Sequence, residues 1–259
     1  MKLIQQTANC SDFDVVLDTD MPAFRVLLPE HVASHMEVIH TGHAHTIRGA
    51  WRQIADGCGG LFRIEERVEV SVQIFAERGG IAIVLTLRNL TPDPLRHVTV
   101  NVCASVNHLP GAPPWCNRQF LPDVPIERFE QGRYWYEVVT PNGLRALTRR
   151  GWRLMHPTPQ NPSAANIDPY TFLPSAAPEA FACAAQSHDG RKLFFQAWDV
   201  PCYYAAPFCG NACMHLHPLV AEVLESGASA TIHGHVGIFE GGWEDLAGIH
   251  PSCIKRERF

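Results

Sequence analysis

The sequence predicts an all-β protein, built as a large antiparallel β-sandwich. Short runs in which apolar and polar residues alternate recur along the chain, and Gly, Pro, Asn and Asp bound these runs. Helical periodicity is almost absent. Because the expected strands are long and numerous, we expect two large packed sheets. A sandwich of that size curves, and we expect one polar face to form a concave trough.

The composition indicates one domain that spans residues 1–259. The chain has 259 residues, of which 46% are hydrophobic, and this is enough to bury a sizeable core. The net charge is −5, and no Lys/Arg run stands out before the KRERF tail. The charge balance therefore argues against nucleic acid or an anionic membrane as the main partner.

The cysteines and the first residues indicate a soluble cytoplasmic protein. The nine cysteines are an odd count without a regular spacing, which favours free thiols in a reducing compartment. The opening run MKLIQQTANCSDFDVV lacks the apolar centre of a secretory signal, and no stretch of about 18 apolar residues occurs in the chain.

The strand pattern is clearest in the middle of the chain. Apolar residues alternate with polar ones over 68–74, 81–87 and 98–102. Short turns at 77–80 and 89–94 predict that these three strands form a meander. The other expected strands cover 14–17, 24–28, 36–39, 133–139, 144–147, 181–186 and 193–198, and the stretch 209–242 ends in a two-faced strand over 231–238.

Two long Pro-rich segments, 109–131 and 156–178, interrupt the strand pattern. Loops of this length inside a compact domain are uncommon and often functional. We expect them to rim the trough, a geometry that suits an extended polar ligand. A short helix is expected at 243–249, near the end of the sequence.

Two His-x-His pairs mark the part of the chain where chemistry is expected. These pairs are His215/His217 and His233/His235, and Glu222 lies between them. On an extended strand, residues two apart point the same way, so each pair presents both imidazoles on one face. We expect the two pairs to meet at the floor of one hollow.

The order of these features resembles the galactose-mutarotase-like sandwiches, a superfamily of sugar epimerases, lyase domains and glycosidase domains. The resemblance is carried by the run LFRIEERVEVSVQIF, the run IAIVLTLRNLTPDPLRHVTV and the ending VLESGASATIHGHVGIFEG. The ending departs from the usual pattern at Ser226, where proline is usual. The resemblance covers residues 60–240 in architecture. It implies a carbohydrate ligand and, as in the mutarotases, a His acid with a Glu base.

A second resemblance is to the first cupin motif, in which two His and one Glu bind a metal. The matching residues are Gly210, His215, His217, Glu222 and Gly227. The Gly-to-His spacing is one residue short, the Glu-to-Gly spacing is two short, and the second cupin motif is not present. This resemblance implies an alternative fold, the cupin-like double-stranded β-helix, with a metal-dependent site for a small polar substrate.

The four histidines have two chemical interpretations. His215, His217, His233 and His235 suit a divalent metal such as Zn, Fe, Mn or Ni, with Glu222 as a further ligand. An open coordination position would then activate water or a hydroxyl. Without a metal, His215 and His217 supply a general acid, and a nearby carboxylate supplies the base. Glu222 is the catalytic carboxylate we expect, with Glu240 and Asp199 as the other local carboxylates. The structural alternative is that the imidazoles only line a polar sheet face.

Five further side chains are candidates for substrate binding. Trp115 and Trp198 have flat apolar surfaces that can stack on sugar rings, although a Trp is more often a core residue. Arg118 and His156 lie in the two long loops, where they can meet a uronate carboxylate. Asp199 directly follows Trp198 and is the fifth candidate.

The sequence therefore predicts a carbohydrate-active protein that binds or transforms a sugar or oligosaccharide in a His-rich concave site. Epimerase, lyase and hydrolase chemistry all fit this prediction. A cupin-like metal enzyme and a non-catalytic carbohydrate-binding module are the alternatives. The sequence leaves the sugar, the reaction and the oligomeric state open.

Overall fold

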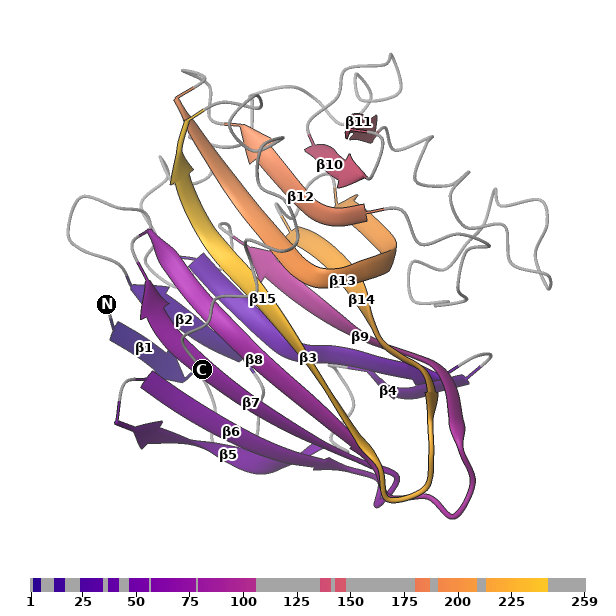
Figure 1. Cartoon of the computed structure of the whole chain (residues 1–259). Helices are drawn as coiled ribbons and strands as arrows, with labels where there is room; N and C mark the ends of the chain where they lie inside the picture. The colour runs from indigo at the N-terminus through magenta and orange to yellow at the C-terminus, as the bar shows by residue number, and fades with distance from the viewer. Residues whose placement is uncertain are drawn as a thin grey trace.

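A computed structural model describes residues 2–5, 12–16, 24–34, 37–41, 47–55, 57–77, 79–105, 136–140, 143–147, 180–186, 191–208 and 213–241 (Figure 1). This part of the chain contains fifteen strands and no helix, and so nothing in it forms a helix able to cross a membrane. The strands are β1 (Lys2–Gln5), β2 (Asp12–Val16), β3 (Phe24–Ser34), β4 (Glu37–Thr41), β5 (Ile47–Ile54), β6 (Gly57–Ile64), β7 (Val68–Glu77), β8 (Gly80–Asn89), β9 (Leu95–Ser105), β10 (Tyr136–Thr140), β11 (Gly143–Leu147), β12 (Ala180–Gln186), β13 (Lys192–Phe208), β14 (Cys213–Leu224) and β15 (Ser229–Glu240).

The expectation of an all-β antiparallel fold is confirmed. Each pair of neighbouring strands in the described part of the chain is antiparallel. The strands form one connected sheet, whose main path runs β1-β2-β3-β9-β14-β13-β15-β8-β7-β6-β5. β4 pairs with β3, and a branch from β13 continues through β12 and β10 to β11.

β13 divides this sheet into two layers. Its residues 192–198 pair with β15, and its residues 202–208 pair with β14. We call β1–β4, β9 and β14 the first layer, and β5–β8 and β15 the second layer. In Figure 1, β3 of the first layer passes behind β15 of the second. A strand that bends from one sheet into another makes a corner between two packed sheets.

Two contacts hold β13 at the corner where it leaves β15. Trp198 is fully buried and lies opposite Gly234, where a Cβ would be only 2.6 Å from the indole ring. Asp199 accepts a hydrogen bond from the backbone N–H of His233 at 2.9 Å. The β13–β15 register ends at Trp198, so the Asp199 carboxylate takes over from the β13 backbone as the partner of that N–H group.

The core lies between the two layers. Strands β9 and β14 of the first layer and β7, β8 and β15 of the second all contribute buried side chains to one cluster. Phe13 of β2 meets the edge of Trp51 of β5, with ring centroids 5.0 Å apart. Because β2 and β5 stand near opposite ends of the strand path, the sheet has folded over until its two ends meet. The predicted sandwich is therefore confirmed.

The predicted meander is only half right. β7 pairs with β8 as predicted, but β9 pairs with β3 and β14 in the first layer. The turn 90–94 therefore carries the chain from one layer to the other. The turn 225–228, between β14 and β15, makes a second crossing of this kind. Alternation of apolar and polar residues does not distinguish a turn within one layer from a turn that crosses to the other layer, since both leave one face of each strand buried.

Asn89 ties the two crossings together; the ends of β8 and β14, from which the crossings start, lie at the lower right of Figure 1. Its fully buried Nδ2 donates to the carbonyl oxygens of Asp93 at 2.8 Å and Leu224 at 3.0 Å. Its Oδ1 accepts from the N–H of Thr91 at 2.9 Å and from the Thr91 hydroxyl at 2.7 Å. The Asn89 backbone N–H also donates to the carbonyl oxygen of Ala228, and the Asn89 carbonyl oxygen accepts from the backbone N–H of Gly227. All four hydrogen-bonding positions of the buried side-chain amide are thus used.

Several elements differ from those predicted or lie beyond the described residues. The patterns did not predict β1, β5, β6 or the second half of β13. β6 reads GCGGLFRI, and its three glycines look like a turn because glycine is the commonest loop signal. The segments 109–131 and 156–178 and the helix expected at 243–249 lie outside the described residues.

Replacing Gly234 by alanine is expected to destabilise the corner of β13. The added Cβ must displace the Trp198 indole, and we expect the free energy of unfolding to fall by about 1–3 kcal/mol. Urea unfolding followed by tryptophan fluorescence measures this change. Gly59→Ala is the matched control, because a Cβ there lies 3.4 Å from its nearest neighbour, Ile54 Cγ2. Equal stability of the two variants would contradict the close packing at Gly234.

Replacing Asn89 by alanine is expected to lower the free energy of unfolding by about 2–4 kcal/mol, because buried groups in both crossings lose their partner. The same urea titration measures it. Ser226→Ala is the control, since it removes one exposed hydrogen bond, from Ser226 Oγ to the Thr91 carbonyl oxygen at 2.7 Å. That loss should be no more than about 1 kcal/mol. If both variants lose the same amount, Asn89 does not hold the crossings.

Candidate functional site

A buried polar face lies on the outer side of the first layer. On β9 the valines at 98, 100 and 102 enter the core, so the residues between them point to the other side. On β14, Met214 and Leu216 enter the core, which turns the neighbouring histidines to that same outer side. We call this set the polar face. Its members, all buried, are Glu30, His31, Thr99, Asn101, Cys103, Ser105, His215 and His217.

An irregularity in β3 brings Glu30 to the polar face. β3 pairs with β9 at Leu27–Cys103 and again at His31–Asn101. Four residue steps on β3 therefore span only two on β9, and the extra residues bulge out of the ladder. Bulges of this kind change the direction in which side chains point. Glu30 lies within the bulge.

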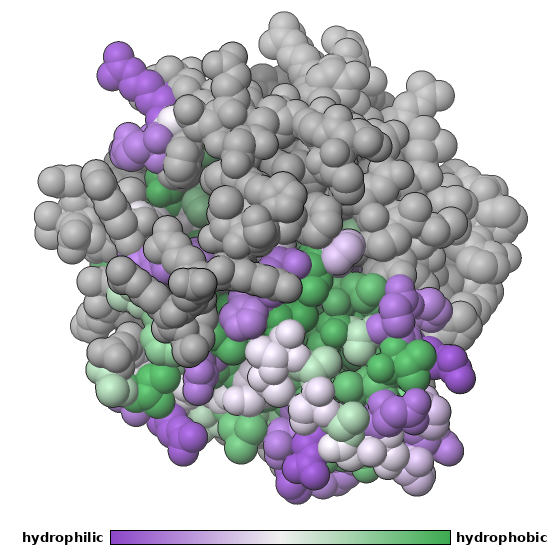
Figure 2. All heavy atoms as spheres, viewed as in Figure 1, coloured by the Kyte–Doolittle hydropathy of each residue, from purple (hydrophilic) through white to green (hydrophobic). Residues whose placement is uncertain are grey.

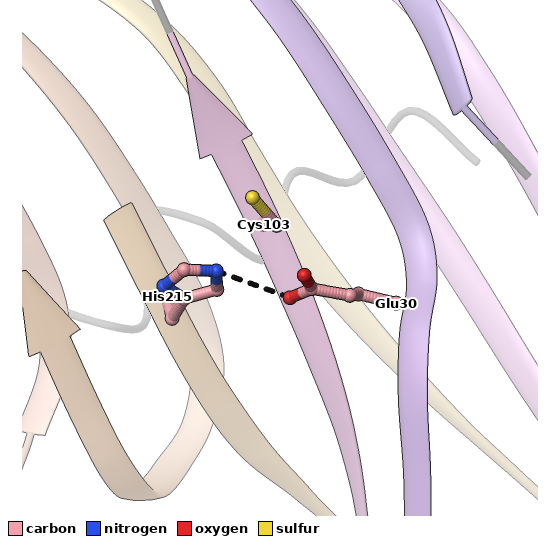
Figure 3. A group of neighbouring side chains, drawn as sticks. All are labelled: Glu30, Cys103 and His215. Carbon is pink, nitrogen blue, oxygen red and sulfur yellow. Dashed lines mark ion pairs between the residues drawn. The ribbon is translucent and has the colours of Figure 1, made fainter. Parts of the chain in front are cut away.

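Glu30 is at the centre of the contacts on the polar face (Figure 3). Its Oε2 accepts a hydrogen bond from Asn101 Nδ2 at 2.5 Å, and it lies 3.1 Å from His215 Nε2 and 3.7 Å from His31 Nε2. Cys103 lies beside this pair. One donor atom from each of Glu30, Cys103 and His215 lies within 4.8 Å of the other two. Figure 3 shows these three side chains gathered from β3, β9 and β14.

The surroundings of Glu30 are nearly dry. The exposed fraction is 6% for Glu30, 5% for His215 and 2% for Asn101. A buried carboxylate costs several kcal/mol unless partners compensate for the lost water, and the amide and imidazole groups are such partners. A hydrogen-bonded imidazole and carboxylate can pass a proton between them or hold the hydroxyl of a ligand. The arrangement can therefore serve acid–base chemistry.

The structure does not bring the two predicted His-x-His pairs together. His215 and His217 lie on the outer side of the first layer. On β15 the isoleucine and valine side chains enter the core, so His233 and His235 lie on the outer side of the second layer. The core separates the two pairs.

His233 and His235 each contact a carboxylate of their own. His233 Nδ1 lies 3.0 Å from Asp199 Oδ2, and His235 Nδ1 lies 3.0 Å from Glu77 Oε2. Both imidazoles are partly exposed, in contrast to those of the polar face. Asp199, a predicted substrate-binding residue, also holds the His233 backbone at the corner of β13.

Glu222, the predicted catalytic carboxylate, lies away from the polar face. It follows His217 by five residues, which corresponds to about 16 Å along an extended strand. Its side chain is 58% exposed, and its Oε2 lies 2.6 Å from Nδ1 of His97. The structure therefore pairs the predicted His215 with Glu30, and it pairs Glu222 with a surface histidine.

The predicted aromatic and loop candidates fall into two groups. Trp198 is fully buried against Gly234, so its ring presents no exposed face on which a sugar can stack. Trp115, Arg118 and His156 lie outside the described residues.

Sequence reasoning missed Glu30, Asn101 and Cys103. Glu30 could have been found from the sequence, because it stands in the apolar run VLLPEHVA, which is expected to be buried. A glutamate is seldom fully buried unless it is paired, so its place in that run indicates a partner. Asn101 and Cys103 alternate with the valines of β9 and carried no signal of their own. Their part in the site depends on β9 crossing into the first layer, which the alternation pattern did not predict.

Cys58, on β6, is a half-buried thiol outside the polar face. Burial raises the pKa of its thiol above the ordinary value, which favours the protonated form at neutral pH. Its Sγ lies 3.5 Å from Gln53 Oε1, to which it donates. Because the thiolate is the reactive form of cysteine, this environment suits a structural residue rather than a nucleophile.

Comparisons with known proteins give no match in sequence and weak matches in structure. No protein-family model matches the chain, and no curated protein matches it. A polysaccharide lyase has 12% identity and a TM-score of 0.44, over 92% of this chain and 32% of the lyase. A galactose mutarotase-related enzyme from Lactobacillus acidophilus has 9% identity and a TM-score of 0.39, over 85% of this chain and 84% of that one.

The chain spans about a third of the length of the polysaccharide lyase that it matches. The mutarotase-related enzyme is of the class that the sequence resemblance named, and the resemblance is weak in structure as it is in sequence.

Proposed function

We propose that this chain binds a carbohydrate at the polar face of the first layer and transforms it by proton transfer. The observation that carries the proposal is the buried pair of His215 Nε2 and Glu30 Oε2, 3.1 Å apart. The sequence resemblance to galactose-mutarotase-like sandwiches favours a sugar as the ligand. Epimerase, lyase and hydrolase reactions all need the transfer of a proton to or from carbon or oxygen, which such a pair performs.

The other groups of the polar face complement a ligand rich in hydroxyls. The face offers hydroxyl groups at Thr99 and Ser105, an amide at Asn101 and imidazoles, which together supply both hydrogen-bond donors and acceptors. Asn101 Oδ1 is buried and has no hydrogen-bond partner within the described part of the chain. A buried acceptor in this state costs free energy, and a sugar hydroxyl that donates to it would recover that cost.

Burial sets the conditions for the chemistry. A ligand that reaches Glu30 and His215 is enclosed in surroundings nearly free of water, where interactions between charges are stronger than in water. The imidazole then takes a proton from the sugar, or the imidazolium gives one to it, and the carboxylate stabilises the imidazolium form in both cases. Asn101 holds the carboxylate by its 2.5 Å hydrogen bond and so acts as a positioning residue.

Calorimetric titration of the purified chain with D-galactose, D-glucose and D-glucuronate tests the ligand class. We expect binding of at least one sugar, and a loss of affinity of tenfold or more in His215→Ala, which corresponds to about 1.4 kcal/mol. Exchange between sugar anomers, followed by NMR, tests turnover. Glu30→Gln should keep most of the affinity and lower the exchange rate by about 10²–10⁴-fold.

His97→Asn is the matched control, because it removes a second His–carboxylate pair that lies away from the polar face. Asparagine also tolerates the positive φ of 48° at this position. The control should keep both affinity and turnover. Unchanged sugar affinity in His215→Ala would contradict the site, and affinity without any turnover would leave a non-catalytic binding module.

A further inference from the structure

We propose that Glu30, Cys103 and His215 form a zinc site. Their carboxylate oxygen, thiol sulfur and imidazole nitrogen all lie within 4.8 Å of one another. The three residues come from three adjacent strands, β3, β9 and β14. The β9–β14 ladder holds His215 opposite Cys103, and Glu30 lies in the bulge of β3 that faces β9. In Figure 3 the side chains meet over β9, with the sulfur above and the imidazole and carboxylate beside it.

The three donor atoms are those that Zn²⁺ prefers. In proteins the ion binds thiolate sulfur at about 2.3 Å, imidazole nitrogen at about 2.0–2.1 Å and carboxylate oxygen at about 2.0–2.2 Å. Tetrahedral geometry then places the donors about 3.3–3.6 Å from one another. His215 Nε2 and Glu30 Oε2 are already 3.1 Å apart, and the three donor atoms lie within 4.8 Å of one another, so side-chain shifts can bring them to these distances. A soft thiolate beside an imidazole disfavours Mg²⁺ and Ca²⁺, which take oxygen ligands.

Charge balance also favours a dication at this place. A carboxylate and a thiolate carry two negative charges, and a divalent ion with a neutral imidazole brings the group to zero. The side chains are buried, with exposed fractions of 6% for Glu30, 8% for Cys103 and 5% for His215. A neutral buried cluster avoids the cost of an isolated charge in surroundings of low polarity.

The neighbouring Asn101 orients the carboxylate ligand. Asn101 Nδ2 donates to Glu30 Oε2 at 2.5 Å, and the asparagine is itself only 2% exposed. Hydrogen bonds of this kind fix the direction of a metal ligand and raise the affinity for the ion. His31 Nε2, 3.7 Å from the same oxygen, adds a second polar group behind the site.

Three protein ligands leave one position of a tetrahedral ion open, as in catalytic rather than structural zinc sites. This site deepens the proposed function and rests on it for the identity of the group that takes the open position, a sugar hydroxyl or water. With the ion bound, Glu30 and His215 would hold the metal and would no longer transfer the proton themselves. The ion would instead increase the acidity of the group on the open position.

Cobalt titration of the purified full chain, first stripped with a chelator, tests the site. We expect one equivalent of Co²⁺ to bind and to produce the near-ultraviolet absorption of a cobalt–thiolate bond, which one equivalent of Zn²⁺ then abolishes. Cys103→Ser should lose this absorption. Cys58→Ser and Cys202→Ser should keep it, since these two cysteines lie outside the group.

Two further variants keep the test decisive if Cys103→Ser does not fold. Glu30→Gln should weaken Zn²⁺ binding by more than tenfold, and Asn101→Leu should weaken it by about 10–100-fold through loss of the orienting hydrogen bond. Circular dichroism checks that each variant is folded. The proposal is overturned if the wild-type chain shows no cobalt–thiolate absorption, if folded Cys103→Ser keeps that absorption, or if folded Glu30→Gln binds Zn²⁺ as tightly as wild type.

The zinc site and the proposed function fail in different ways. Sugar titration of the chelator-stripped and the zinc-loaded chain separates them. Sugar binding without stoichiometric metal binding overturns the zinc site and leaves the carbohydrate proposal standing. Zinc binding at Cys103 without affinity for any of the three sugars supports the zinc site and contradicts the carbohydrate proposal.

Discussion

The bend in β13 is the constraint on which the rest of the structure depends. The strand leaves β15 after Trp198 and joins β14 from Cys202, so one ladder of backbone hydrogen bonds runs through both layers. Gly234 leaves room for the indole at the corner, and Asp199 satisfies the backbone group that β13 leaves behind. Because the bend places β14 and β15 on opposite sides of the core, the histidines of the two strands point in opposite directions.

The same residue types therefore have different properties in the two layers. In the first layer, His215 and Glu30 lie in surroundings almost free of water, where an ionised group needs partners and where a bound ligand would be enclosed. In the second layer, His235 and Glu77 are partly exposed, so water screens their attraction and weakens its contribution to stability. Burial, more than residue identity, makes the first layer the better candidate for chemistry.

Strand patterning predicted the fold class and most of the strands, because alternation of apolar and polar residues reports directly which face is buried. It predicted that β7 and β8 are neighbours, but it did not predict the neighbours of β9. β9 has the same alternation whether it returns beside β8 or crosses to β14. In the structure the buried amide of Asn89 joins the two crossings by hydrogen bonds. The residues of the site were predicted only in part, for the same reason. His215 was predicted from its own strand, whereas Glu30 and Cys103 come from strands more than a hundred residues earlier in the chain, and no local pattern joins them.

The fully enclosed amide of Asn89 has a consequence for how the protein can be made. Asn89, Leu90 and Thr91 spell an acceptor sequence for N-linked glycosylation. The nitrogen that would carry the glycan is the atom that donates to two backbone carbonyls in the finished fold. Glycosylation during synthesis in a secretory pathway would place a bulky oligosaccharide where the two crossings must close. Production in a bacterial cytosol avoids that obstacle.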